Sequence, residues 1–328
     1  MSRAALVARV ERWRVAGAFT ISRGAKTYVD VVVAEVHADG HVGRGEGTPI
    51  YYHGESGDIV LAQLLDAADA VAGGLARDEL QQRLPRGAAR NALDCALWDL
   101  EAKRRQVPVW RLAGLAEPEP LVTAMTISLG EPAQMEADAR ARADLPLLKL
   151  KLAGEGDVAR VAAVRRGAPD ARLIVDANEA WSGRDVAAET AALLPYGVEL
   201  IEQPVRAGED HLLDSVDSPI PLCADESCQD RADLSRCMGR YQAINIKLDK
   251  CGGLTEALAL AAEAHAAGLE MMAGCMLATS LGIAPATLVG QQARWVDLDG
   301  ALLLAEDRPA ALRVTKAGLS LPAPALWG

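Results

Sequence analysis

Hydrophobic and polar positions follow two different rhythms along the chain. Residues 6–46 carry the alternating and continuous apolar runs of strands, interrupted by the turn Asp39-Gly40. Residues 54–74 and 87–112 have helical spacing instead, and in the second segment apolar side chains recur three and four positions apart. An antiparallel sheet followed by helices predicts a compact α+β unit at the start of the chain.

After residue 114 short apolar strands alternate with Ala-rich helical stretches, such as 157–166, 185–194 and 254–267. The predicted strands lie at 121–128, 147–152, 173–178, 198–203, 221–227, 243–249, 269–275 and 295–299. From residue 147 onward their starts are 22 to 26 residues apart, the size of one βα unit. Seven or eight such units without insertions predict an α/β fold of the TIM-barrel type rather than an open, doubly wound sheet. The tail, 302–328, is again strand-like and is expected to fold back on the first unit.

Composition and charge exclude several classes of partner. Half of the 328 residues are hydrophobic, as in an ordinary globular protein. The formal net charge of −11 argues against nucleic acid and against an anionic membrane surface as partners.

Six cysteines without a C-x-x-C pair are expected to be small buried thiols in a reducing compartment. No run fits a membrane span or a signal peptide, so we expect a soluble, cytoplasmic protein. Neither a monomer nor a homo-oligomer is favoured.

Polar residues interrupt the predicted barrel strands near their C-terminal ends. In residues 147–152, Leu-Leu-Lys-Leu-Lys-Leu, Lys149 and Lys151 share one face of the strand. In a barrel the leucines of the other face would meet the outer helices, and both lysines would point into the mouth. Taken alone, this strand favours the alternative of an edge strand whose lysines face water.

Three consecutive predicted strands end in an acid. Asp176, with Asn178 on the same face, ends the first, Glu202 ends the second and Asp225 ends the third. Three carboxylates at one rim would repel one another in a low-dielectric mouth, and a bound divalent cation resolves that conflict. Oxygen-only ligands suit Mg²⁺. The alternative is that each acid caps the helix that follows it.

Lys247 lies four strands after Lys151, so the two amines should face each other across an eight-stranded barrel. Lys250, which competes for this role, lies in the following Lys-Cys-Gly-Gly turn and is expected to face solvent. A carbon acid beside a carboxylate needs strong stabilisation of the charge that develops as its proton leaves, which Mg²⁺ and Lys149 could supply. Neighbouring cations would also lower the pKa of Lys151 toward that of a usable base. Two bases on opposite faces are typical of a racemase or epimerase.

These motifs together resemble the enolase superfamily, in its muconate-lactonizing subgroup: Lys149-x-Lys151, Asp176-x-Asn178, Glu202-Gln-Pro, Asp225-Glu-Ser and Asn245-Ile-Lys247. The helical segment 88–99 and Pro108-Val-Trp-Arg-Leu-Ala-Gly114 are similar to the capping-domain signature of that family. The resemblance implies an α+β capping domain at 1–113, joined by the tail 302–328, over a modified (β/α)₇β barrel at 114–301. It also implies one Mg²⁺ on Asp176, Glu202 and Asp225, with Lys151 and Lys247 as acid/base catalysts. Asn178 and Glu226 are expected to support the metal ligands.

The last predicted strand narrows the range of possible substrates. Asp297 and Asp299 in Trp295-Val-Asp-Leu-Asp-Gly300 would share a face at the rim, where an acid pair suits a substrate ammonium group. This Asp-x-Asp resembles the dipeptide epimerases, although a charged turn ended by glycine is the alternative. Arg23 in the loop Ile21-Ser-Arg-Gly24 is expected, on the same resemblance, to pair with a glutamate side chain, unless it is a solvated loop charge. The implied substrate is L-Ala-D/L-Glu, a murein-peptide fragment.

Other functions are compatible with some of these motifs. An o-succinylbenzoate synthase or an N-acylamino-acid racemase of the same subgroup would have no need of Asp297 and Asp299, and a dipeptide epimerase of other specificity would keep them. A non-catalytic barrel that binds metal or ligand would have little reason to keep both Lys151 and Lys247.

Overall fold

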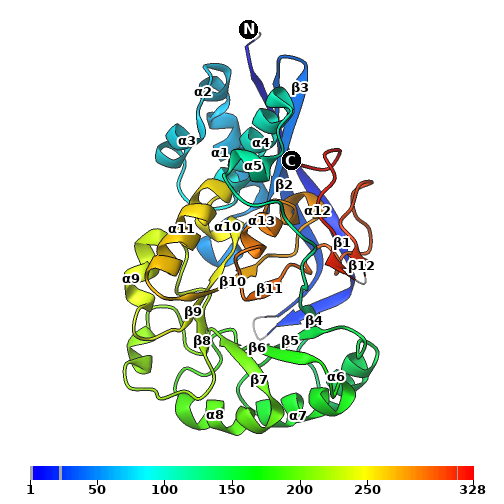
Figure 1. The fold of residues 1–328 in the computed structure, drawn as a ribbon, viewed down its shortest axis with the longest axis vertical. Helices are drawn as coiled ribbons and strands as arrows, with labels where there is room; N and C mark the ends of the chain where they lie inside the picture. The colour runs from blue at the N-terminus through cyan, green and yellow to red at the C-terminus, as the bar shows by residue number, and fades with distance from the viewer. Residues whose placement is uncertain (1–2, 22–23, 316) are drawn as a thin grey trace.

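The computed structural model describes residues 3–21, 24–315 and 317–328. A sheet with its helices, built from the first part of the chain, lies against one end of a barrel of parallel strands, and the C-terminus returns to the junction between them (Figure 1). This arrangement confirms the prediction of a modified TIM barrel with an α+β capping unit.

The capping unit contains, among the described residues, an antiparallel sheet in the order β1-β2-β3. The strands are β1 (Ala5–Ile21), β2 (Gly24–Ala38) and β3 (His41–Gly47). The helices are η1 (Tyr51–His53), α1 (Gly57–Asp66), α2 (Ala68–Ala72), α3 (Arg77–Arg83), α4 (Ala88–Arg105) and α5 (Val109–Leu112). The strand-like and helical rhythms of residues 6–112 therefore correspond to real elements, with α3 as an additional helix between the two predicted ones.

Helix α4 lies unusually close to strand β3 because both contribute small residues. Gly43, Gly45 and Gly47 alternate along one face of β3, and a Cβ atom on any of them would overlap a backbone carbonyl of α4. The carbonyls belong to alanines of α4, at 96, 92 and 88 respectively. This close approach fixes α4 between the capping sheet and the barrel.

The barrel contains, in the described part of the chain, eight parallel strands in sequential order from β4 to β11. They are β4 (Met125–Ile127), β5 (Leu147–Lys151), β6 (Arg172–Asp176), β7 (Val198–Glu202), β8 (Leu222–Ala224), β9 (Ala243–Ile246), β10 (Glu270–Gly274) and β11 (Trp295–Asp297). The ring is closed by a hydrogen bond of 2.7 Å from the backbone N–H of Ala124 to the carbonyl of Val296. Seven of these strands fall inside the segments predicted for them, and β6 begins one residue before its predicted segment.

Helices and short helical turns connect the strands. They are α6 (Pro132–Arg140), α7 (Asp157–Gly167), α8 (Val186–Leu193), η2 (Leu194–Tyr196), η3 (Asp210–Leu213), η4 (Arg231–Asp233), α9 (Leu234–Cys237), α10 (Leu248–Cys251), α11 (Leu254–Ala266), α12 (Ser280–Ile283) and α13 (Ala286–Gly290).

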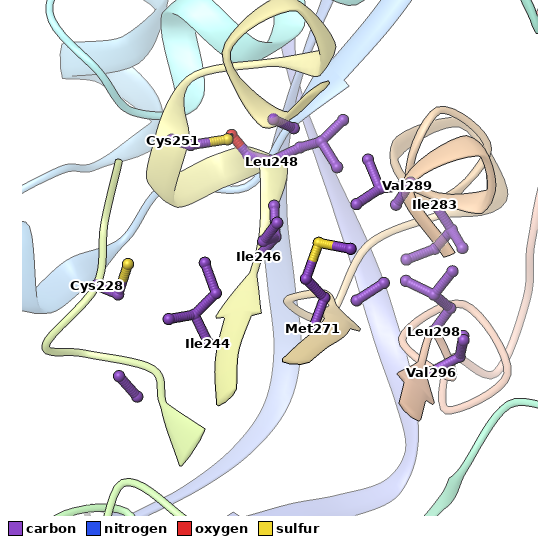
Figure 2. Close-up of a cluster of buried hydrophobic side chains, with 14 of the residues drawn as sticks. Cys228, Ile244, Ile246, Leu248, Cys251, Met271, Ile283, Val289, Val296 and Leu298 are labelled. Atoms are coloured by element: carbon purple, nitrogen blue, oxygen red, sulfur yellow. The ribbon is translucent and has the colours of Figure 1, made fainter. Parts of the chain in front are cut away.

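One apolar layer closes the inside of the barrel below its mouth. Each barrel strand, or the residue directly before it, contributes one side chain to this layer. The layer consists of Ala124, Leu147, Ile174, Leu200, Cys223, Ala243, Met272 and Trp295, all essentially inaccessible to solvent. Outward-facing residues of the same strands, among them Ile244, Met271 and Val296 (Figure 2), belong to the apolar cluster that also contains residues of the surrounding helices. Two residues farther along the strands the inward face becomes charged, so the apolar layer is the floor of a polar chamber.

The tail differs from its prediction. It folds back on the first unit, since the Trp327 indole N–H donates to the carbonyl of Cys95 in α4 and Val15 of β1 pairs with Leu304. Its regular structure is limited, among described residues, to β12 (Val314–Thr315) and β13 (Gly318–Leu319), so the expected strand-like character is largely wrong. The tail is held by packing and single hydrogen bonds rather than by a ladder.

All six cysteines lie in the described part of the chain and are free thiols, five of them buried. In that same part of the chain, no helix combines the length and apolar character needed to cross a bilayer.

Candidate active site

The charged residues at the strand ends converge at one rim of the barrel. Each comes from an inward-facing position of its strand, because side chains alternate between the two faces of a strand. Lys149 lies in the middle of β5, and the others lie at or just beyond the C-terminal end of their strands. The set is almost fully buried and consists of Lys149, Lys151, Asp176, Glu202, Asp225, Lys247 and Asp297. Leu148 and Leu150, in contrast, pack outward, so the edge-strand alternative for residues 147–152 is excluded.

Lys149 occupies the centre of the rim. Its ammonium lies 2.5 Å from Glu202 Oε2, 2.6 Å from Asp297 Oδ2 and 3.4 Å from Asp176 Oδ2. Burial opposes the charge, but these three carboxylates hold the pKa of Lys149 well above its usual range. Lys149 is therefore a fixed positive charge and is suited to stabilising an anion rather than to accepting a proton.

Lys151 and Lys247 stand on opposite sides of this centre, on β5 and directly after β9, four strands apart. Lys151 lies 2.7 Å from Asp176 Oδ2, and Lys247 lies 2.6 Å from Asp225 Oδ2. Burial disfavours the ammonium of Lys247, yet Asp225 and Glu202 keep its pKa well above the usual value. Both lysines line one cavity of about 240 Å³, so a small molecule in it would have an amine on either side.

The three acids are the candidate metal ligands, and their donor atoms fit a hard divalent cation. Asp176, Glu202 and Asp225 are at most 2% exposed and offer carboxylate oxygens only. Among the described residues, no three acidic, His or Cys side chains are already arranged as a metal cage. Instead the ammonium groups of Lys149 and Lys247 stand between the carboxylates, 2.5 Å and 3.7 Å from Glu202. The rim thus already uses cations to compensate three neighbouring negative charges.

Burial would raise the pKa of each of these acids, but neighbouring charges move the three pKa values in different directions. Lys151 and Lys149 bring the pKa of Asp176 down to about 2, and Lys247 with Lys250 holds that of Asp225 well below its usual range. Glu202 lies between them, and burial together with the charge of Asp176 raises its pKa.

Two amides, which the sequence analysis quotes within motifs but to which it gives no role, hold the acids in place. The Asn245 amide donates to Glu202 Oε1 at 2.7 Å. The buried Gln203 side chain accepts from the backbone N–H groups of Asp225 and Ser227, at 2.7 and 3.0 Å. Asn245 could have been found from the sequence, since it lies two residues before Lys247 on the same inward face. Gln203 follows its strand with a positive φ of 37°, which no sequence pattern indicates.

Asn178 and Glu226, predicted to support the metal ligands, both line the cavity. The backbone N–H of Asn178 donates to Asp176 Oδ1 at 2.9 Å. The prediction for Lys250 is wrong, because its side chain is inaccessible to solvent. Its ammonium lies 2.7 Å from Asp225 Oδ1 and donates to the backbone carbonyls of Asp225, Cys228 and Asn245. The turn that carries Lys250 folds inward instead of outward.

Asp297 and Asp299 are both buried but have different partners. Asp297 Oδ2 faces Lys149, whereas Asp297 Oδ1 accepts no hydrogen bond from the described residues. Asp299 Oδ2 accepts the backbone N–H of Thr126 at 2.7 Å. Burial and the nearby charge of Asp297 raise the pKa of Asp299 to about 7.

The capping unit supplies the outer wall of the cavity. Phe19 of β1 lies over Lys151, with 5.8 Å between the ammonium and the ring centre, and Lys26 of β2 lies 4.8 Å from the ring centre of Tyr51. Tyr51 and Tyr52 of η1, in the segment between β3 and α1, also line the cavity. Arg23, the predicted partner of a glutamate side chain, lies outside the described residues.

Comparison with known proteins agrees with this geometry. The family model for the enolase C-terminal domain-like fold matches residues 133–311, and that for the N-terminal domain of mandelate racemase / muconate lactonizing enzyme matches residues 3–114. The L-Ala-D/L-Glu epimerase of Escherichia coli strain K12 is 46% identical over 95% of this chain and 98% of that protein. An N-acetyl-D-glutamate racemase from a Pseudoalteromonas species is 47% identical over 76% of this chain and 79% of that protein.

A solved structure from Agrobacterium tumefaciens is also similar, with a TM-score of 0.96 and 48% identity over 99% of this chain and 100% of that one. It is an enolase family member with homology to dipeptide epimerases, and it holds sodium and L-Ala-L-Glu with an ordered loop. The chain therefore belongs to the enolase superfamily, in the mandelate racemase and muconate lactonizing enzyme family, and its relatives are isomerases of the epimerase and racemase type.

Proposed function

We propose that this protein is a Mg²⁺-dependent dipeptide epimerase, which moves the α-proton of the C-terminal residue from one face of its carbon to the other. The observation that carries the proposal is the pair Lys151 and Lys247, on opposite sides of one cavity, with the acids of the intervening strands between them. An epimerisation needs one base on each face, and the cavity offers one amine on each.

In this mechanism one lysine, in its neutral form, removes the α-proton and the other, as an ammonium, returns a proton to the opposite face. Lys149 keeps its charge and stabilises the negative charge that develops on the substrate carboxylate. Mg²⁺ held by Asp176, Glu202 and Asp225 would neutralise that carboxylate and, by engaging the acids that now pair with the lysines, would favour a neutral base. Phe19, which lies over Lys151, would limit the access of water to that side of the substrate.

We further propose L-Ala-D/L-Glu, a murein-peptide fragment, as the substrate. The buried Oδ1 of Asp297, which accepts no hydrogen bond from the described residues, supports a site for the substrate ammonium. Arg23 would meet the glutamate side chain. The E. coli relative is an L-Ala-D/L-Glu epimerase, and the similar solved structure holds L-Ala-L-Glu.

A second candidate is an N-acylamino-acid racemase, which the similarity to an N-acetyl-D-glutamate racemase supports. Its substrate has the same α-carbon and carboxylates but no ammonium group. The acids at the end of the last strand favour the dipeptide, because an uncharged N-acetyl group would leave Asp297 without a cationic substrate partner.

Deuterium uptake tests the proposal. The purified protein with Mg²⁺ in D₂O should incorporate one deuteron at the glutamate α-carbon of L-Ala-L-Glu and of L-Ala-D-Glu, detected by mass spectrometry. N-acetylglutamate should exchange much more slowly, and Arg23→Met should slow exchange of Ala-Glu while sparing Ala-Leu. Fast exchange of N-acetylglutamate with none of any dipeptide would favour the racemase instead.

A further inference from the structure

Lys247 is not held by the strand ladder of the barrel. Strand β9 ends at Ile246, and Lys247 is the residue before the short helix α10. Lys151, in contrast, is the last residue of β5, and its backbone is in register with Asp176 of β6. The two proposed bases are thus positioned by different means, and the position of Lys247 depends on what holds α10.

The barrel holds α10 on one side. The ammonium of Lys250 donates to three backbone carbonyls of the rim, at 2.5, 2.8 and 3.0 Å. On the same short helix, Leu248 and Cys251 are part of the apolar packing around β9 and β10 (Figure 2).

The capping unit holds the two ends of α10 on the other side. At its C-terminal end the Arg90 guanidinium of α4 donates to the carbonyls of Cys251 and Gly252, at 2.5 and 3.2 Å. At its start, next to Lys247, the contact is made by Oδ1 of Asp249. This oxygen accepts the backbone N–H of Thr48 at 2.8 Å and the Asn91 amide at 2.8 Å. Asn91 belongs to α4 and also donates to the carbonyl of Glu46 at the end of β3. Asp249 is 7% exposed, so water competes little for these bonds.

Through its hydrogen bond with Thr48, Asp249 Oδ1 is also connected to the wall of the cavity. Thr48 begins the segment that carries Tyr51 and Tyr52 to the cavity, and all three residues line this cavity together with Lys247. Asp249 therefore connects three parts in one step: the loop over the substrate cavity, helix α4 of the capping unit, and the turn that carries Lys247.

We propose that Asp249 is a positioning residue for Lys247, acting through α10, and that this contact with the capping unit governs the half-reaction of Lys247 and not that of Lys151. The inference rests on the proposed function, since it presupposes that the two lysines act on opposite faces. It assigns to Asp249 no contact with substrate.

The prediction is an asymmetric loss of exchange. In D₂O at saturating dipeptide, Asp249→Ala should slow α-proton exchange of the isomer deprotonated by Lys247 by about 10- to 100-fold, because a displacement near 1 Å is costly for proton transfer. Exchange of the other isomer, deprotonated by Lys151, should change by less than about 3-fold. Lys247→Ala identifies which isomer is which, since it abolishes exchange of that isomer.

A conservative variant and a matched control separate positioning from general damage. Asp249→Asn retains one amide oxygen able to accept both hydrogen bonds and should restore the wild-type ratio of the two exchange rates. Asp94→Ala removes another buried carboxylate from the same interface; Asp94 lies in α4 and accepts the N–H and hydroxyl of Thr255. This variant should leave the ratio unchanged. If Asp249→Ala does not fold, Asn91→Ala removes one of the two donors and should shift the ratio in the same direction by a smaller factor.

The outcomes distinguish this inference from the proposed function. A shifted ratio in Asp249→Ala, restored by Asp249→Asn and absent in Asp94→Ala, is the expected result. Equal slowing of both isomers, or no slowing of either, would overturn the positioning role and leave the epimerase standing. No exchange of any dipeptide by the wild-type protein would overturn the proposed function, and the positioning role with it.

Discussion

Buried carboxylates occur in two regions of this molecule, and the comparison shows what each region is for. At the barrel rim, Asp176 and Asp225 are opposed by lysines, which overcome the effect of burial and lower their pKa values. At the interface between the capping unit and the barrel, Asp94 and Asp249 have neutral hydrogen-bond donors as their closest partners, and burial raises their pKa values to about 6 and about 7. The rim keeps its charges for chemistry, while the interface uses carboxylates as hydrogen-bond acceptors that need little charge.

The largest effect is expected at the rim, when the proposed metal ion is removed from its charged acids. Removing divalent cations with EDTA should lower kcat/KM for L-Ala-L-Glu by more than about 1000-fold, because the rim acids would then have only lysines to balance them. Added Mg²⁺ should restore activity and should raise the Tm of the wild-type protein but not of Glu202→Gln. Full activity after exhaustive chelation would show that the acids serve another purpose.

A smaller effect is expected where the rim meets the substrate ammonium. Asp297→Asn should lower kcat/KM for L-Ala-L-Glu by more than about 30-fold, because a buried charge-assisted partner is worth about 2–5 kcal/mol. Steady-state rates on N-acetylglutamate, which has no ammonium, provide the comparison and should fall far less. If both substrates lose the same factor, Asp297 acts through Lys149 alone.

The smallest effect is expected at the interface and concerns stability. Because burial raises the folded-state pKa of Asp94 to about 6, its contribution to stability is fully present below pH 4 and is lost as the pH rises through about 6. The unfolding free energy of the wild-type protein relative to Asp94→Asn should therefore fall by about 2 kcal/mol between pH 4.5 and pH 7. Urea titrations at both values measure it. A difference that grows with pH would mean that Asp94 is ionised in the folded protein.

Sequence patterns could predict the barrel and the rim because both follow the period of two along a strand. The alternation in residues 147–152 correctly places Lys149 and Lys151 inside and the leucines outside. The same rule could not place Lys250, which lies beyond the strand in a turn that bends inward against three carbonyls. Gln203 and Asp249 act through tertiary contacts with distant segments, and no local pattern encodes such contacts.

The C-terminal tail, 302–328, is a second case in which a local sequence pattern does not predict the structure. Its apolar residues have a strand-like rhythm, but its described residues pair with the rest of the chain only at two isolated bridges, and anchors such as Trp327 hold it to α4. The roles of Asp176, Glu202 and Asp225 as metal ligands, and of Arg23 at the substrate, stay predictions of the sequence and its resemblance.

The central claim is that Lys151 and Lys247 act as bases on opposite faces of one α-carbon. The most direct test is α-proton exchange in D₂O, with Mg²⁺, measured separately for L-Ala-L-Glu and L-Ala-D-Glu in Lys151→Ala and Lys247→Ala. Both variants should lose epimerisation by more than about 100-fold. Each should retain exchange of one isomer only, and the retained isomer should differ between them. Near-wild-type epimerisation in either variant, or retention of the same isomer in both, would contradict the two-base account.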